Sequence, residues 1–210
     1  IDALDGLMAR VIDKAGIQFR MLNMSKGPAV RGPRAQADRE LYKKYMLQSL
    51  QEQENLTILE AAAEGLIIDN KEISGIITSD GKKIYSTTVV LTTGTFLNGI
   101  MFVGHETTVG GRINDVACNG ITPYLKSLDL TVKRLKTGTP ARLNADSINW
   151  SILEKQTGDN PPIPFSFLTE KITNPQIDCY ITHTNEETHK IIRDNFEKCA
   201  LFSGLIKGVG

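Results

Sequence analysis

Cysteine, histidine and tryptophan are scarce in this chain of 210 residues, which contains three, three and one of them. Cys118, Cys179 and Cys199 are too few and too scattered for a disulfide framework, and they favour a reducing, cytoplasmic compartment. The chain also lacks a run of about 18 apolar residues, so we expect no membrane span, and we expect no signal peptide at its start. These absences argue against a secreted disulfide-rich module and against a membrane protein.

Net charge is also absent, because 24 Lys and Arg residues balance 24 Asp and Glu residues. A neutral total gives no compositional sign of nucleic-acid binding, although a local basic patch can still bind a polyanion. Apolar residues make up 40% of the chain, enough for a core, and the length suits one large domain or one and a half ordinary ones. The chain starts at Ile1 within an amphipathic pattern and stops at Gly210 without a terminal signal, so we expect an internal piece of a longer protein.

Several catalytic fingerprints are missing as well. The patterns G-x-S-x-G, H-E-x-x-H and G-x-x-x-x-G-K do not occur. No internal repeat or low-complexity tract is present.

Hydrophobic spacing predicts these elements. Apolar residues at helical intervals predict helices over residues 4–15, about 35–54, 122–128 and 186–198. The first helix is expected to end at a left-handed cap at Gly16, and the last to begin after an Asn185 cap. Alternating or short apolar patterns predict strands at residues 17–22, 56–59, 66–68, 73–79, 83–87 and 179–183.

Residues 89–92 form a continuous apolar run, which predicts a strand buried on both faces. The run leads directly into Thr93, Gly94 and Thr95, where a small side chain and a glycine let a ligand approach the backbone closely. Ligands gather at the carboxyl ends of strands in open α/β sheets. An ordinary exit from a strand is an equally good interpretation of these residues alone.

Three further stretches could hold an anion. Gly110, Gly111 and Arg112 combine backbone amides with a guanidinium and could bind a phosphate or a carboxylate, although such a sequence is more often a simple turn. The basic loop over residues 26–34 and the cations of residues 133–136 could contact phosphate. Solvated loops are the plainer interpretation of both. Composition changes near residue 142, where we place a domain boundary ahead of a Pro-rich connector.

Cys179, His183 and His189 have a spacing that invites a metal or catalytic interpretation. A structural zinc site needs four ligands, often with paired cysteines, and only three candidates are present. A cysteine with a histidine could form a nucleophile and its base, but a strand cysteine beside a tyrosine is more often a small core residue. We therefore expect no metal site here and assign no catalytic residue.

Seven stretches of the chain closely resemble the GidA/MnmG family. They are residues 1–19, 25–31, 34–39, 90–97, 110–112, 134–140 and 179–185. The resemblance implies an α/β protein with a glutathione-reductase-like FAD-binding fold, which combines a Rossmann-like sheet with a β-meander. Residues 1–141 would be part of the FAD-binding domain without its first dinucleotide loop, and residues 142–210 would start an inserted α/β domain that binds NAD(P)H.

The resemblance also implies an activity. Together with the GTPase MnmE, the family attaches a carboxymethylaminomethyl-type group to carbon 5 of the wobble uridine in certain tRNAs. Methylene tetrahydrofolate would supply the one-carbon unit, and reduced nicotinamide would supply electrons to the flavin. A homodimer joined by MnmE into a heterotetramer is implied, with no role for a membrane.

Carried over by position, the cofactor contacts fall at Ala63, Thr93, Gly94, Thr95, Gly110, Gly111, Arg112 and Cys118, and the nicotinamide segment begins near Gly210. The chain departs from the family at residues 114–118, where relatives tend to have Gly-Asp-Pro-Pro-Ser or similar. Cys118 keeps a small side chain there but hydrogen-bonds more weakly than serine. The family's two proposed catalytic cysteines match none of the three here, so we expect this chain alone to be inactive and to hold FAD weakly.

Three alternatives are open. The first is a sister flavoprotein such as the folate-dependent tRNA uracil methyltransferase. The second is a flavin oxidoreductase that acts on small molecules and is indifferent to tRNA. The third is a non-enzymatic remnant or docking module.

Overall fold

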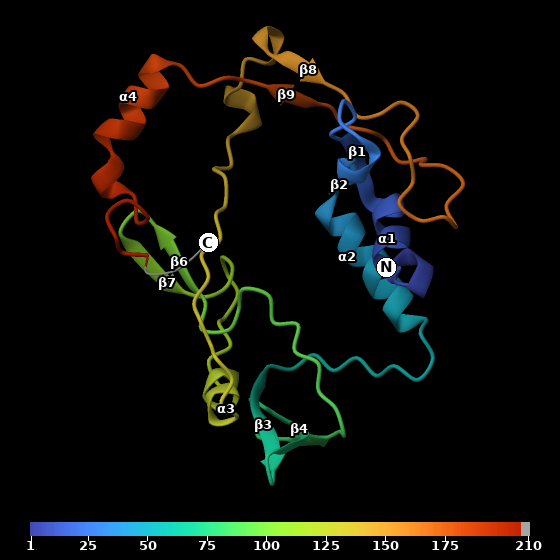
Figure 1. The fold of residues 1–210 in the computed structure, drawn as a ribbon, viewed down its shortest axis with the longest axis vertical. Coiled ribbons are helices and arrows are strands. Elements are labelled where there is room, and N and C mark those ends of the chain that lie inside the picture. Colours follow the sequence, from blue (N-terminus) through green and yellow to red (C-terminus); the bar gives the residue numbers. More distant parts are fainter. Residues whose placement is uncertain (207–210) are drawn as a thin grey trace. The chain divides into compact units, whose positions relative to one another are not determined.

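The computed structural model describes residues 1–206 (Figure 1). These residues divide into two compact units. One unit consists of residues 1–58 and 143–183, and the other of residues 59–142 together with the described residues from 184 on. Each has buried apolar residues of its own. Val11 and Phe19 lie in the first core, and Leu66 and Ile121 in the second.

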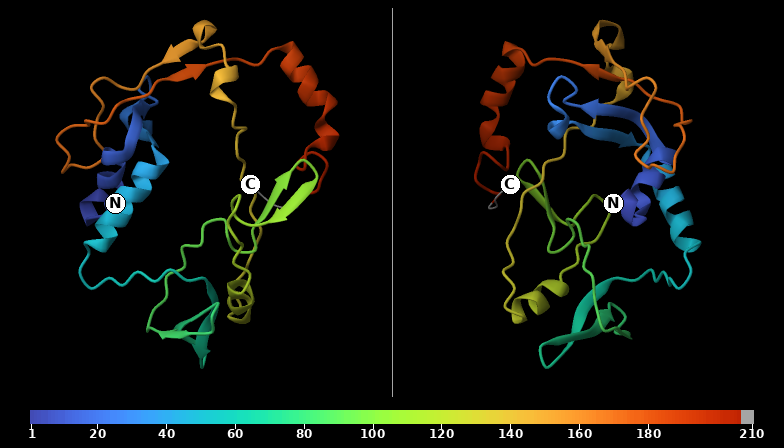
Figure 2. Two further views of the ribbon diagram at one scale, coloured as in Figure 1. Left: turned by 180° about the vertical axis from the view of Figure 1, so that it is seen from behind. Right: turned by 45° about the vertical axis from the view of Figure 1, so that its right-hand side comes forward.

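The first unit is built from two helices and two antiparallel strand pairs. Its helices are α1 (Leu7–Ala15) and α2 (Arg39–Gln51), and its strands are β1 (Gly16–Leu22), β2 (Gly32–Ala37), β8 (Glu154–Gln156) and β9 (Cys179–Ile181). Single 3-10 turns lie at Asp2–Leu4, Pro28–Val30, Ala145–Ser147 and Trp150–Ile152. Strand β1 pairs with β2, β8 pairs with β9, and α2 lies beside α1 in both views of Figure 2.

Buried polar contacts tie the two sequence segments of this unit together. Asp13 in α1 is 4% exposed, and its carboxylate accepts hydrogen bonds from the N–H groups of Phe165 (2.8 Å) and Ser166 (2.9 Å). The Phe19 carbonyl accepts a hydrogen bond from the N–H of Asp159 (2.8 Å). These bonds satisfy groups that would otherwise be buried without partners.

The second unit contains a β-meander, a hairpin and two helices. Strands β3 (Ala63–Asp69), β4 (Glu72–Thr78) and β5 (Lys83–Tyr85) form an antiparallel sheet, and β6 (Ile100–Val103) pairs with β7 (Glu106–Val109). The helices are α3 (Ile121–Ser127) and α4 (Glu186–Asp194), followed by a 3-10 turn at Phe196–Lys198. Helix α3 packs against β3, where Gly65 leaves room for the Tyr124 ring.

The α/β class and the β-meander are confirmed, as are the helices at α3 and α4 and the Asn185 cap, whose side chain accepts from the Thr188 N–H at 2.8 Å. The predicted left-handed cap at Gly16 is wrong, because this residue is extended (φ −73°) and opens β1. The second helix begins at Arg39, four residues later than expected, since residues 32–37 pair with β1. The last predicted helix ends at Asp194 and continues only as the 3-10 turn.

Two predicted strands are wrong. Residues 56–59 and 89–92 have no regular secondary structure and belong to no sheet of the described chain. An apolar run becomes a strand only where a neighbour takes its backbone hydrogen bonds, and Val90 is instead 84% exposed. The boundary at residue 142 and the two functional domains stay predictions. No helix among residues 1–206 is long and apolar enough to cross a membrane.

Candidate functional site

The candidate cofactor loop, residues 93–99, is a tight turn in the second unit. The N–H of Phe96 donates to the Thr93 carbonyl at 3.1 Å, and Gly94 between them has φ +55°. This left-handed conformation favours glycine, which has no Cβ to clash. Gly94 and Thr95 are exposed, so the turn presents its backbone to solvent at the place where the sequence predicted a ligand.

The segment over residues 110–120 packs against this loop. The Thr95 hydroxyl donates to the Gly111 carbonyl at 3.1 Å, and the Phe96 ring lies against Gly111 so closely that a Cβ there would be 2.7 Å from a ring carbon. Farther along, the Cys118 N–H donates to the Phe96 carbonyl and the Asn98 N–H donates to the Cys118 carbonyl, both at 2.9 Å. The structure therefore joins the two predicted binding loops.

Strand β3 completes this cluster. The Cys118 thiol donates to the Ala63 carbonyl at 3.2 Å, and the Gly120 N–H donates to the Glu64 carboxylate at 3.0 Å. The thiol contact is weak, but the backbone bonds on both sides of Cys118 do not depend on its side chain. Ala63, Cys118 and the loop at residues 93–95, which lie far apart in the sequence, thus come together in one unit.

Arg112 has a more restricted role than its sequence suggested. Its Nε lies 2.7 Å from a carboxylate oxygen of Asp115, and the two side chains are 56% and 36% exposed. This pair neutralises part of the positive charge through one of the five guanidinium N–H donors. Gly110 donates its N–H to the Gly99 carbonyl at 2.9 Å, so its amide is already used. The anion-binding role of residues 110–112 stays a prediction.

The structure adds Asn98 and Thr122, which the sequence did not single out, and gives Arg134, one of the predicted phosphate-contacting cations, a partner within this cluster. The Arg134 guanidinium donates to the Asn98 carbonyl at 3.0 Å, and the Thr122 hydroxyl donates to the Asn98 side chain at 3.3 Å. Asn98 has φ +48°. The Asn98-Gly99 dipeptide is a turn signal that could have indicated this position, whereas nothing local indicates the partner of Arg134.

Other predicted residues lie elsewhere. Gly210 lies outside the described residues. The thiol of Cys179 contacts the side chains of Gln18 and Gln36, and His189 contacts the Thr184 hydroxyl at 2.8 Å. Within residues 1–206, no three His, Cys, Asp or Glu side chains gather as metal ligands.

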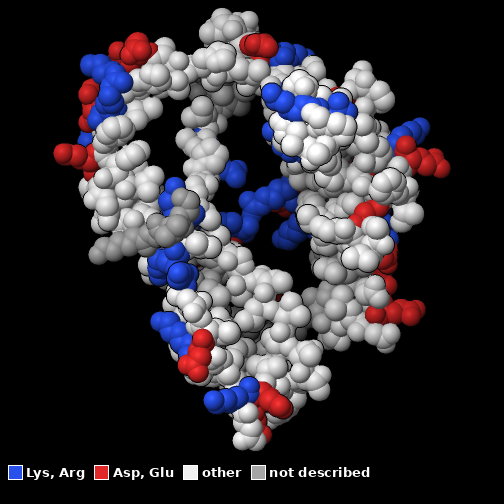
Figure 3. All heavy atoms as spheres, in the orientation of Figure 1, with Lys and Arg blue, Asp and Glu red and all other residues white. Residues whose placement is uncertain are grey.

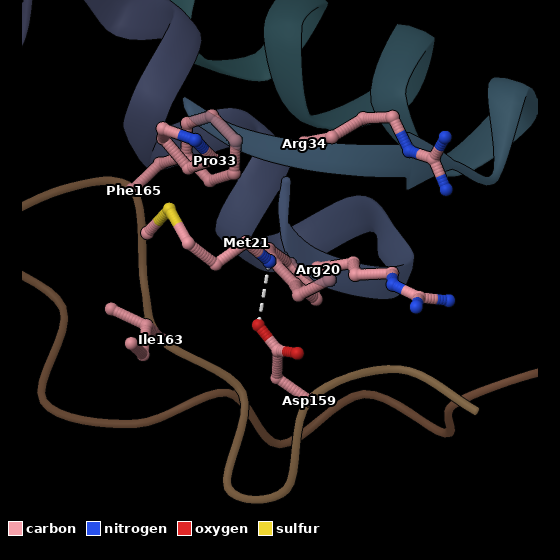
Figure 4. A pocket seen from close by; sticks show the side chains of 8 residues that line it. Arg20, Met21, Pro33, Arg34, Asp159, Ile163 and Phe165 are labelled. Atoms are coloured by element: carbon pink, nitrogen blue, oxygen red, sulfur yellow. Dashed lines mark hydrogen bonds between the residues drawn. The ribbon is translucent and has the colours of Figure 1, made fainter. Parts of the chain in front are cut away.

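The predicted basic loop lies in the first unit, on the hairpin of β1 and β2. A small pocket opens beside this hairpin, where the Met21 N–H donates to the Asp159 carboxylate at 2.6 Å and the Ile163 and Phe165 side chains line the wall (Figure 4). Arg20 and Arg34 extend away from that carboxylate in the same view. Figure 3 shows a patch of Lys and Arg on this face, where Figure 1 places β1 and β2.

Comparisons with known proteins extend over the whole chain. The family model for "Glucose inhibited division protein A" matches residues 1–210. The tRNA uridine 5-carboxymethylaminomethyl modification enzymes MnmG of Thermodesulfovibrio yellowstonii and Geobacter sulfurreducens are 51% and 49% identical to all 210 residues. The chain spans 34% of each of these relatives, about a third of their length.

Solved structures agree with these relatives. A structure of Aquifex aeolicus GidA has a TM-score of 0.90 with 44% sequence identity, over all of this chain and 36% of that one. A second crystal form of the same protein has a TM-score of 0.86 and 43% identity, over 93% of this chain and 33% of that one. Both the fold and the order of the loops described above are therefore shared with a protein of known structure.

Proposed function

The chain belongs to the glucose inhibited division protein A (GidA) family, and from this premise we propose that the whole protein is a flavin-dependent enzyme that modifies tRNA. It would add a carboxymethylaminomethyl-type group to carbon 5 of the wobble uridine. The observation that carries the proposal is the match along all 210 residues to two MnmG enzymes named for this reaction, at 51% and 49% identity. Because the chain spans only a third of those enzymes, the activity is proposed for the full-length protein.

The joined loops of the second unit are the proposed FAD contacts. Backbone groups at Thr93, Gly94 and Thr95 lie beside the segment of Gly111, which the Phe96 ring contacts directly. Exposed turn amides and small side chains suit the close approach of a dinucleotide. When bound, FAD would supply the redox chemistry, and the protein would position it and exclude competing reactions.

The remaining parts of the proposal come from the family resemblance. NAD(P)H would be the electron donor and methylene tetrahydrofolate the one-carbon donor. An MnmE-like GTPase would be the partner of a homodimer, in a heterotetramer, and the enzyme would work in the cytoplasm. The catalytic cysteines of the family match no cysteine of this chain, so we assign no catalytic residue to residues 1–210 and expect this chain alone to be inactive.

The test is nucleoside analysis of tRNA from a strain deleted for the full-length gene, with and without complementation. Loss of the modified wobble uridine, restored by the wild-type gene, is the expected result. A strain that keeps the modification, or that loses a 5-methyluridine elsewhere in the tRNA, would contradict the proposal, and the second outcome would favour the folate-dependent methyltransferase alternative. Purified full-length protein should carry visible flavin absorbance, whereas the 210-residue chain alone should not.

A further inference from the structure

Arg20 of β1 and Arg34 of β2 are direct partners in the antiparallel register. Side chains of directly opposite residues project from the same face of a hairpin, with Cβ atoms about 5 Å apart. Figure 4 shows the two guanidinium groups extending in the same direction from neighbouring strands. Like charges placed opposite each other destabilise a strand pair, so this arrangement carries a cost that something else must offset.

No acidic side chain offsets this charge within the hairpin. The sequence contains no Asp or Glu between Asp13 and Asp38. Among residues 1–206, neither Arg20 nor Arg34 forms a side-chain hydrogen bond or an ion pair. The nearby carboxylate of Asp159 is occupied by the Met21 N–H at 2.6 Å.

The next register pair on the same face of the hairpin, Gln18 and Gln36, is joined by a side-chain hydrogen bond. The Gln36 amide donates to the Gln18 side-chain oxygen at 3.2 Å. Gln18 is 2% exposed and also donates to the Gln156 carbonyl at 3.2 Å. The glutamine pair is therefore joined by a direct hydrogen bond, whereas the arginine pair carries ten N–H donors on its two guanidiniums.

We propose that Arg20 and Arg34 together hold one backbone phosphate of the tRNA, an inference that rests on the proposed function. A phosphate placed between the two guanidinium groups would accept several charge-assisted hydrogen bonds, and its negative charge would offset the repulsion between them. Lys26 and Arg31, both exposed, continue the positive charge along the segment between the strands. Such an exposed strip of cations suits a polyanionic backbone better than the single phosphate group of a small cofactor.

Binding of this kind positions the RNA without reading its bases. The experiment uses the full-length protein with FAD and measures its Kd for tRNA at several salt concentrations. Arg20→Gln and Arg34→Gln should each raise the Kd roughly tenfold, the effect of losing a hydrogen bond to a charged group. The double variant should reduce the slope of log K against log salt by about 1, because the pair neutralises one phosphate, and each single variant should reduce it by less. The double variant should lose less than the product of the two single effects, because both side chains serve one phosphate.

Lys43→Gln is the matched control, since Lys43 is an exposed cation on α2 of the same unit. It should leave both the Kd and the salt slope unchanged. Arg20→Lys and Arg34→Lys keep the charge but lose the planar fork, so they should retain the slope and lose part of the affinity. Because Arg34→Gln removes a repulsion at an exposed position, its thermal unfolding midpoint should stay level or rise, which separates lost binding from lost folding.

Unchanged tRNA affinity and slope in both glutamine variants would overturn the inference. So would a loss of NADPH affinity with tRNA binding intact, which would assign the pair to a cofactor phosphate. Failure of the proposed function looks different, because the wild-type gene itself would then fail to restore the modified uridine in the deletion strain. If Arg20→Gln does not fold, Arg34→Gln and the two lysine variants still decide the question.

Discussion

Replacing Asp13 by alanine in the full-length protein should loosen the attachment of residues 165–166 to helix α1. The buried carboxylate of Asp13 accepts hydrogen bonds at 2.8 and 2.9 Å from the N–H groups of Phe165 and Ser166. A buried N–H left without a partner costs about 1–3 kcal/mol. The Ser166 N–H is buried and would stay unsatisfied, whereas the half-buried Phe165 N–H can regain water. We therefore expect a local loss of about 2–4 kcal/mol.

Amide hydrogen exchange at Phe165 and Ser166 measures this loss directly. Since 1.4 kcal/mol is a factor of ten in an equilibrium constant, a loss of about 3 kcal/mol corresponds to roughly 100-fold faster exchange. Asp5→Asn is the control, because the exposed Asp5–Arg10 pair should contribute less than about 1 kcal/mol and asparagine tolerates the positive φ at position 5. Equal exchange rates in wild type and Asp13→Ala would refute the reasoning.

Gly111→Ala should reduce the flavin content of the purified full-length protein. The added methyl carbon would lie 2.7 Å from a Phe96 ring carbon and force the two loops apart, at a cost of about 1–3 kcal/mol. Undiminished flavin absorbance in this variant would contradict the proposed FAD contact. Cys118→Ser should hold FAD at least as well as wild type, since a hydroxyl makes the stronger bond to the β3 carbonyl, and a colourless serine variant would be the contrary result. The Thr78 hydroxyl donates to the Asp80 carboxylate and lowers the pKa of Asp80 below its ordinary value of 3.8. Because this pKa is lowered by folding, the associated stabilisation is present above about pH 4 and is lost as the pH falls through the lowered pKa. Thr78→Val should raise the Asp80 pKa towards 3.8 in an NMR titration.

Local periodicity predicted those elements whose hydrogen bonds are also local. Helices α3 and α4 and the meander of β3 to β5 were all visible in the sequence, because a helix bonds within itself and a meander pairs neighbours through short turns. Residues 32–37 show the limit of this approach. Residues 32–34 were expected to end a loop with a Gly-Pro break and residues 35–37 to open the second helix, but pairing with β1 makes all of them a strand. A proline near the outer end of an edge strand costs no ladder bond.

The candidate site, too, could be predicted only where its contacts are local in the sequence. The turn at Thr93-Gly94 could be predicted from a glycine that follows an apolar run. The contact between Cys118 and Ala63 could not, since 55 residues separate them and only the docking of two loops onto β3 brings them together. The family resemblance predicted both residues as cofactor contacts, and the structure supplies a physical reason that they lie together. The backbone of Cys118 bonds to Phe96 and Asn98, and its thiol bonds to the Ala63 carbonyl.

Arg20 and Arg34 can be recognised as a pair only when the sequence is combined with the strand register. In the sequence they are two unremarkable cations, and the segment between them is a basic loop with no stated target. Once the strands pair, they become like charges on one face, a conflict with the rules of strand pairing that a glutamine at either position would remove. Departures from locally favourable choices are expected where a sequence serves a ligand as well as a fold. If the phosphate is the missing partner, the hairpin should be most stable with tRNA bound, and hydrogen exchange of the β1 and β2 amides should slow on addition of tRNA in wild type but not in the Arg20→Gln, Arg34→Gln double variant.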